Sequence, residues 1–173
     1  MIEEPDFEGL VEQYYSALYR FAFSLSHSES DACDLTQDTF LIWAKKGEQM
    51  RDRSKVKSWL FTTLHREFLQ RRRRTTRFPE IQISDAEFEL PEVPPISNEK
   101  LDRQNVFNAV ARLDHNFQTV VSLFYLEDYS YPEIAEILEI PLGTVKSRIS
   151  RGVAQLQQFL LQPELTEKRG GAR

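Results

Sequence analysis

The sequence predicts an all-α protein made of two small helical domains that a flexible, acidic linker joins. Apolar residues recur at three- and four-residue spacing in both halves of the chain, which is the period of an amphipathic helix. The stretch between the halves instead collects four prolines and five acidic side chains, as extended linkers do. We therefore expect a first domain at residues 1–75, a linker at 76–97, a second domain at 98–162 and a tail at 163–173.

The composition of the 173-residue chain excludes several classes of protein. Hydrophobic residues make up 40% of it, too many for a fully disordered chain, and 6 glycines are too few for a fibrous one. A single cysteine excludes an internal disulfide framework and a cysteine-rich zinc site. The N-terminus lacks the apolar segment of a signal peptide, and no apolar run reaches the roughly 18 residues of a membrane span. We therefore expect a cytoplasmic protein with no membrane span.

The net charge of −5 conceals an uneven distribution of charge. Residues 51–78 carry ten basic and two acidic side chains, whereas residues 79–102 carry seven acidic side chains and one basic. Residues 1–50 are acidic as well, with ten acidic and three basic side chains. A basic segment between two acidic ones indicates that this segment has an anionic partner.

Three helices are predicted in the first domain. Apolar residues at helical spacing mark the first helix from Phe7 to Leu25, and the second spans about Ser30 to Lys46. A third helix begins near Ser54, which we expect to be its N-cap, and it continues into the arginine run at residues 71–74.

The second domain is predicted to end in a helix-turn-helix. Two apolar stripes between residues 106 and 124 indicate supporting helices. Ser130 and Glu133 form a capping box at the start of a short helix over 131–138, and a longer helix follows at 142–161.

The outer face of the last helix carries side chains suited to DNA. Short donors and cations stand there, and no acidic residue occurs between Leu142 and Gln162. In a recognition helix such side chains contact phosphates and base edges in the major groove. The alternative is a plain αα-hairpin with a solvated polar face. The expected DNA-contacting residues are Thr144, Lys146, Ser147, Arg148, Ser150 and Arg151, with readout assigned to Lys146 and Ser147, phosphate contact to Arg151, and Arg148 left open.

The second half of the chain resembles region 4 of bacterial sigma factors. The segment from Glu133 to Leu138 and the string from Gly143 to Gly152 carry the resemblance, and the string is typical of the extracytoplasmic-function (ECF) group. The resemblance implies that this helix-turn-helix reads the promoter −35 element. The chain departs from the family pattern at Asp114, Glu139 and Pro141. Glu139 stands where a left-handed conformation is expected, which is unfavourable for a residue with a Cβ atom.

The segment from Asp31 to Leu41 resembles the region 2 helix that binds core RNA polymerase. Its candidate docking residues follow helical spacing and fall on one face, while apolar residues lie on the other. The resemblance implies docking on the clamp helices of the polymerase β′ subunit, and an ordinary solvated face is the alternative. The docking residues are Asp34, Gln37, Asp38 and Leu41.

The helix from Lys55 onward resembles the ECF helix that meets the −10 element, and the loop before it resembles the loop that captures a flipped base. Its expected outward stripe is Ser58, Thr62, His65, Arg66 and Leu69. Trp59 is expected to belong to the core. The basic residues assigned to −10 DNA are Arg51, Arg53, Arg71, Arg72 and Arg73.

Taken together, the resemblance implies an alternative sigma factor rather than an enzyme. The three histidines are scattered and lack a spaced metal ligand or a nucleophile, so we expect no cofactor, no metal and no small-molecule substrate. The implied partners are core RNA polymerase (β′ clamp helices and β flap) and promoter DNA, with an anti-sigma factor as a further candidate. A sigma mimic that sequesters an anti-sigma protein and a stand-alone helix-turn-helix regulator remain alternatives.

Overall fold

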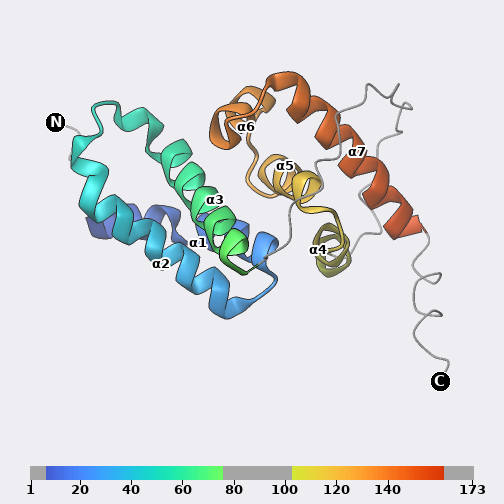
Figure 1. Cartoon of the computed structure of the whole chain (residues 1–173), viewed down its shortest axis with the longest axis horizontal. Coiled ribbons are helices and arrows are strands. Elements are labelled where there is room, and N and C mark those ends of the chain that lie inside the picture. The colour runs from blue at the N-terminus through green and yellow to red at the C-terminus, as the bar shows by residue number, and fades with distance from the viewer. Residues whose placement is uncertain (1–6, 76–102, 162–173) are drawn as a thin grey trace.

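The structure of the protein, a computed structural model, describes residues 7–75 and 103–161, and this part of the chain is all-α, as predicted (Figure 1). The expected linker at 76–97 and the tail at 163–173 lie outside the described residues. No helix in the two described ranges is both long and apolar enough to cross a membrane. The α-helices are α1 (Phe7–Ser26), α2 (Glu29–Lys46), α3 (Val56–Thr75), α4 (Arg103–Ala111), α5 (His115–Tyr125), α6 (Tyr131–Leu138) and α7 (Leu142–Leu161), and short 3₁₀ turns occupy Gly47–Gln49 and Arg53–Lys55.

The first three helices form the N-terminal domain, because each buries an apolar stripe against the other two. Removing these side chains from water is the main term that stabilises such a bundle, at about 25 cal/mol per Å² of apolar surface. The predicted helical spacing is therefore confirmed in three dimensions. The best-buried residues, each no more than 1% exposed, include Leu18, Phe21, Leu35, Leu60 and Leu64.

The starts of α2 and α3 depend on side-chain caps. Ser28 caps α2 by accepting a hydrogen bond from the backbone N–H of Asp31 at 3.2 Å. The predicted N-cap of the third helix, Ser54, is wrong. Asp52 accepts bonds from both the N–H and the hydroxyl of Ser54, at 3.1 and 2.6 Å, so the Ser54 hydroxyl is engaged as a donor. A 3₁₀ turn follows, and α3 begins only at Val56.

The C-terminal domain is built around α5, which packs against α7. Val120, Val121 and Leu123 of α5 are buried, and Gly152 of α7 lies against the same helix. A Cβ atom at Gly152 would stand 2.7 Å from Cγ2 of Val121, so glycine permits the close approach of the two helices.

The short helix α6 begins and ends as the sequence predicts. The Glu133 carboxylate accepts bonds from the N–H and the hydroxyl of Ser130, at 2.8 and 2.7 Å, which confirms the capping box. Glu139 ends the helix in the left-handed conformation, with φ of 57°. The chain then turns into α7, and α6 and α7 form the predicted helix-turn-helix.

The two domains pack directly against each other, α1 against α4 and α5, and α3 against α6 (Figure 1). The guanidinium of Arg20 donates two hydrogen bonds to the carboxylate of Glu127, at 3.2 and 3.1 Å. Phe61 of α3 meets Tyr129 edge to face, with ring centroids 5.2 Å apart. We call this packing of the two domains the closed arrangement.

Candidate nucleic-acid interface

The recognition face on α7 consists of Thr144, Lys146, Ser147, Ser150 and Arg151. The opposite side of the helix is held in the core by Val145 and Ile149, which are at most 4% exposed. The structure thus brings the five side chains together on one side of the helix, where Lys146 is exposed and the others are half-buried. Ser147 donates its hydroxyl hydrogen to the carbonyl of Thr144 at 3.1 Å, which leaves the hydroxyl oxygen as an acceptor.

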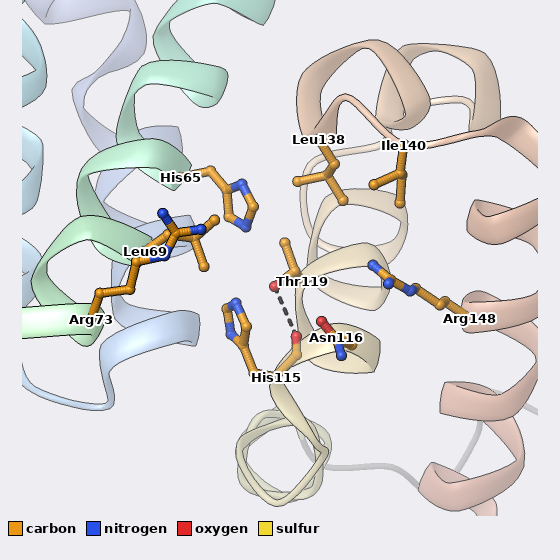
Figure 2. Close-up of a pocket in the computed structure, with 9 residues that line it drawn as sticks. All are labelled: His65, Leu69, Arg73, His115, Asn116, Thr119, Leu138, Ile140 and Arg148. Carbon is orange, nitrogen blue, oxygen red and sulfur yellow. Dashed lines mark hydrogen bonds between the residues drawn. The ribbon is translucent and has the colours of Figure 1, made fainter. Parts of the chain in front are cut away.

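Arg148 does not belong to this group. It lies on the side of α7 that faces the N-terminal domain, where it lines a cavity between the domains (Figure 2). The spacing of Arg148 at the edge of the buried face left its role open, and packing of the domains places it between them.

The candidate docking face on α2 is partly engaged within the protein. Asp34, Gln37 and Leu41 are exposed, and the Leu41 side chain is 56% exposed although it is apolar. Asp38 instead forms an ion pair with Arg71 of α3, so one predicted docking residue binds one predicted DNA-contacting residue. Docking on a partner would remove the exposed Leu41 side chain from water, which is favourable for an apolar group.

The second half of the predicted outward stripe of α3, from His65 to Leu69, is engaged with the C-terminal domain, contrary to expectation. Thr62 donates to the backbone carbonyl of Ser58 at 2.9 Å. Further along the helix, His65 and Leu69 line the interdomain cavity, and Arg66 forms an ion pair with Glu139 of α6. The stripe turned out not to be free because a neighbouring domain, which helical spacing cannot reveal, covers it.

The remaining basic residues of the −10 assignment surround this stripe. Arg51 is exposed, and the guanidinium of Arg53 lies 5.8 Å from the ring of Trp43. Trp43 also meets the half-buried Trp59 edge to face at 5.2 Å, in agreement with a core role for Trp59. Arg72 and Arg73 are exposed in the last turns of α3, and Arg73 also lines the cavity.

The interdomain cavity has a volume of about 180 Å³, and Arg73 and Arg148 are among the residues that line it. The imidazoles of His65 and His115 stack on one side of it, with ring centroids 6.0 Å apart and planes inclined by 14° (Figure 2). Burial is the main cause that lowers the pKa of His65 to about 4, where Glu139 opposes the change and Arg148 adds to it. Burial, followed by Arg72, His65 and Arg148, lowers the pKa of His115 to about 3. Both imidazoles are therefore neutral at pH 7.

Sequence reasoning missed the residues that close the interface from the C-terminal side. Glu136 binds Lys55 at 3.0 Å, and Glu139 binds Arg66. The available signal was that Glu136 and Glu139, on and at the end of a short helix, are acidic while the third helix is basic. Nothing in the sequence indicated His115 or Asn116 as cavity residues. In the described parts of the chain no group of histidine, cysteine and acidic side chains is arranged to hold a metal ion.

Comparison with known proteins gives these surfaces their context. The sigma-70 region 2 family matches residues 10–78, and the sigma-70 region 4 family matches residues 103–156. The chain is 32% identical to the ECF RNA polymerase sigma factor SigE of Mycolicibacterium smegmatis, covering 90% of this chain but 62% of that protein. It is 31% identical to the ECF RNA polymerase sigma factor SigL of Mycobacterium tuberculosis, covering 91% of this chain and 90% of SigL.

A solved structure shares the same overall arrangement. The sigma factor RpoE of Bartonella quintana, in complex with the anti-sigma factor NepR, matches with a TM-score of 0.72 and 33% identity. The match covers 91% of this chain and 98% of RpoE, so it extends over both domains.

Proposed function

Because the chain belongs to the extracytoplasmic-function group of the sigma-70 family, whose members direct transcription initiation, we propose a division of that task among its helices. The candidate docking face of α2 binds core RNA polymerase. The basic helix α3, with the loop before it, contacts the −10 region of the promoter, and the recognition face of α7 reads the −35 element. The surfaces that support this division are present in one chain, in the order of the family's region 2 and region 4.

The observation that carries the polymerase assignment is the composition of the α2 face. Three polar or acidic residues and one exposed leucine lie on the side opposite a buried apolar stripe. The acids complement a basic partner helix, and Leu41 supplies apolar area that is removed from water on docking. A solvated face needs no such leucine.

The DNA assignment requires that the closed arrangement opens. His65 and Leu69 line the interdomain cavity and Arg66 is paired with Glu139, so in the closed arrangement these side chains are engaged with the C-terminal domain. The Arg66–Glu139 and Lys55–Glu136 pairs are more than half exposed, and exposed ion pairs contribute about 0–1 kcal/mol each. DNA phosphates compete with the glutamates for these basic side chains. Promoter binding on core polymerase can therefore replace the ion pairs between the domains and favour their separation.

An anti-sigma factor is a further proposed partner. The match to RpoE extends over both domains, and that structure is a complex with an anti-sigma factor. The closed arrangement of this chain is therefore similar to that of a relative in complex with an anti-sigma factor. We propose that an anti-sigma factor binds the closed arrangement and prevents its opening.

Run-off transcription with purified core polymerase tests the function. The full chain should support initiation from a subset of promoters in a genomic library, and core polymerase alone should not. A Lys146→Ala variant should lose initiation at those promoters while it still binds core polymerase. If the full chain binds core polymerase but starts no transcript at any promoter, the sigma mimic becomes the better assignment.

A further inference from the structure

The interdomain cavity is lined by basic and neutral side chains contributed by both domains. From α3 come His65 and Arg73, and the C-terminal domain contributes His115, Asn116 and Arg148. Figure 2 shows the guanidinium of Arg73 on one side of the cavity and that of Arg148 on the other, with the two imidazoles on the Arg73 side. None of the lining residues is acidic.

The cavity therefore has two arginines in its lining and no acidic side chain to balance their charge. Glu139 is the acid that acts on the pKa of His65, and that carboxylate is already bound to Arg66. Arg148 disfavours protonation of both imidazoles, which shows that its charge reaches across the cavity. Like charges held together destabilise the closed arrangement, and an anion placed between them would remove the repulsion.

The size of the cavity limits what that anion can be. A volume of 180 Å³ lies below the roughly 300–1,000 Å³ of pockets for drug-sized ligands. The cavity therefore suits a ligand smaller than a drug-sized molecule. Two guanidiniums on opposite walls can each hold a different phosphoryl group, because guanidinium binds phosphate oxygens in pairs.

We propose that the cavity between α3 and the C-terminal domain is a binding site for a small diphosphate-class oxyanion. Arg73 and Arg148 each bind one phosphoryl group, and Asn116 offers a neutral amide donor beside them. The Thr119 hydroxyl donates to the carbonyl of His115 at 2.9 Å, so it lines the cavity without donating to the anion. The two imidazoles lie on the same wall as Arg73 and become donors when the anion favours their protonated form.

The anion would act as an inhibitor of promoter binding, a consequence that rests on the function proposed above. It bridges residues of both domains, so it binds the closed arrangement and stabilises it by mass action. It also occupies arginines assigned to promoter DNA. The same site therefore couples a soluble anion to the accessibility of α3.

Binding is tested on the full chain without polymerase or DNA, so its outcome does not depend on the function proposed above. Inorganic diphosphate is titrated by calorimetry at constant ionic strength against a chloride control. The imidazole resonances of His65 and His115 are followed by NMR. We expect saturable binding of one diphosphate and a rise in the pKa of both imidazoles.

Charge-matched variants locate the site. The double variant Arg73→Gln/Arg148→Gln should bind diphosphate at least tenfold more weakly. The control Lys45→Gln/Arg74→Gln removes the same charge from residues that do not line the cavity, and it should bind as the wild type does. Circular dichroism confirms that both variants fold. Equal weakening in the two variants, or none in either, would overturn the proposal, since binding would then follow net charge only.

Further titrations identify the form of the ligand. Orthophosphate offers one phosphoryl group and should bind at least tenfold more weakly than diphosphate. A nucleoside diphosphate that binds at least as tightly as inorganic diphosphate would support the site with a nucleotide as its source, and one that binds more weakly would support the free anion. Equal affinity for orthophosphate and diphosphate would contradict the two-arginine geometry.

Discussion

Two glycines of α7 illustrate how local packing decides the role of a residue. Gly152 is buried, and a Cβ atom there would lie 2.7 Å from Val121 and 3.3 Å from Phe117. At Gly143, in the first turn of the same helix, such a Cβ atom would meet nothing within 4 Å beyond its chain neighbours and the backbone of its own helix. Neither glycine has a positive φ, so the difference between them is one of space.

Alanine substitution should separate these two glycines. Gly143→Ala should raise the free energy of unfolding by up to about 1 kcal/mol, because alanine favours the helix. Gly152→Ala makes the same gain but overpacks the contact between α5 and α7, which typically costs about 1–3 kcal/mol. We expect Gly152→Ala to be the less stable variant by about 1–3 kcal/mol in urea unfolding. Equal stability would show that α7 shifts away from α5 without cost.

At the scale of single helices, α2 and α3 each pack one face into their own domain. The opposite face of α2 is exposed, and that of α3 meets the C-terminal domain. The buried face of α2 packs on α1 and α3, while Asp34 and Leu41 stay exposed. The outer face of α3 contacts the C-terminal domain instead of solvent. Amphipathic spacing identifies the buried stripe of a helix, but it does not say whether the polar side faces water or a second domain.

The docking face is tested by reversing one charge. Asp34 is exposed, whereas Asp38 pairs with Arg71, so Asp34→Arg changes the face with less disturbance of the fold. We expect pull-down of core polymerase to weaken by tenfold or more, with unchanged circular dichroism and melting temperature. Glu12→Arg, an exposed acid of α1 outside the face, is the matched control. Undiminished binding by a folded Asp34→Arg variant would remove α2 from the polymerase contact.

Acidic pH should open the interface between α3 and α5. The lowered pKa values mean that the closed arrangement prefers neutral His65 and His115, so it is stable above their ordinary pKa of 6.5. Below pH 6.5 the separated domains bind protons that the closed arrangement excludes, and its stability falls. From about pH 7.5 to 5.5 the ratio of closed to open molecules should drop about tenfold for each of these histidines.

The measurement is fluorescence energy transfer between labels on α2 and α7, as a function of pH. Glu139, Arg148 and Arg72 face the two imidazoles and act on their charge, with Glu139 opposing the arginines. His65→Phe/His115→Phe keeps aromatic rings at both positions and removes their titration, so it should flatten the response. His27 contacts Gln118 across the interface and has a lowered pKa as well, so a small response should remain. An unchanged pH profile in the double variant would contradict this explanation.

At the scale of the whole molecule, a buried carboxylate joins the two domains. The Glu127 side chain is 3% exposed and lies beside Arg20, which is 53% exposed. Burial raises the pKa of Glu127, while Arg20 acts in the opposite direction. The arginine thus supports a charge that would otherwise be costly to bury.

Removal of Arg20 should weaken the closed arrangement. Arg20→Ala leaves the Glu127 carboxylate buried without its partner, which we expect to destabilise the domain contact by about 1–3 kcal/mol. Arg20→Ala/Glu127→Gln removes the stranded charge and should restore most of the loss. Hydrogen exchange at the interface of α1 and α5 measures both effects. Failure of the double variant to recover would show that Arg20 acts through packing instead of charge.

The sequence by itself determined the elements and the class of the protein. Periodic apolar residues set the helices, and the helix-turn-helix was readable from Ser130, Glu133 and the acid-free α7, because capping and amphipathic burial are local effects. The buried face of α7 and the left-handed Glu139 were predicted for the same reason. The start of α3 was misplaced by two residues because a 3₁₀ turn at Arg53–Lys55, which Asp52 caps, precedes the α-helix.

Only the tertiary structure decided how the two domains meet. The three histidines are scattered along the sequence, yet His27, His65 and His115 all lie where one domain contacts the other. The partners Arg66 and Glu139 are 73 residues apart, and Arg20 and Glu127 are 107 apart. No local rule links residues at such separations, because only the packing of whole domains brings them into contact. The covered face of α3, the place of Arg148 and the basic cavity all follow from that packing.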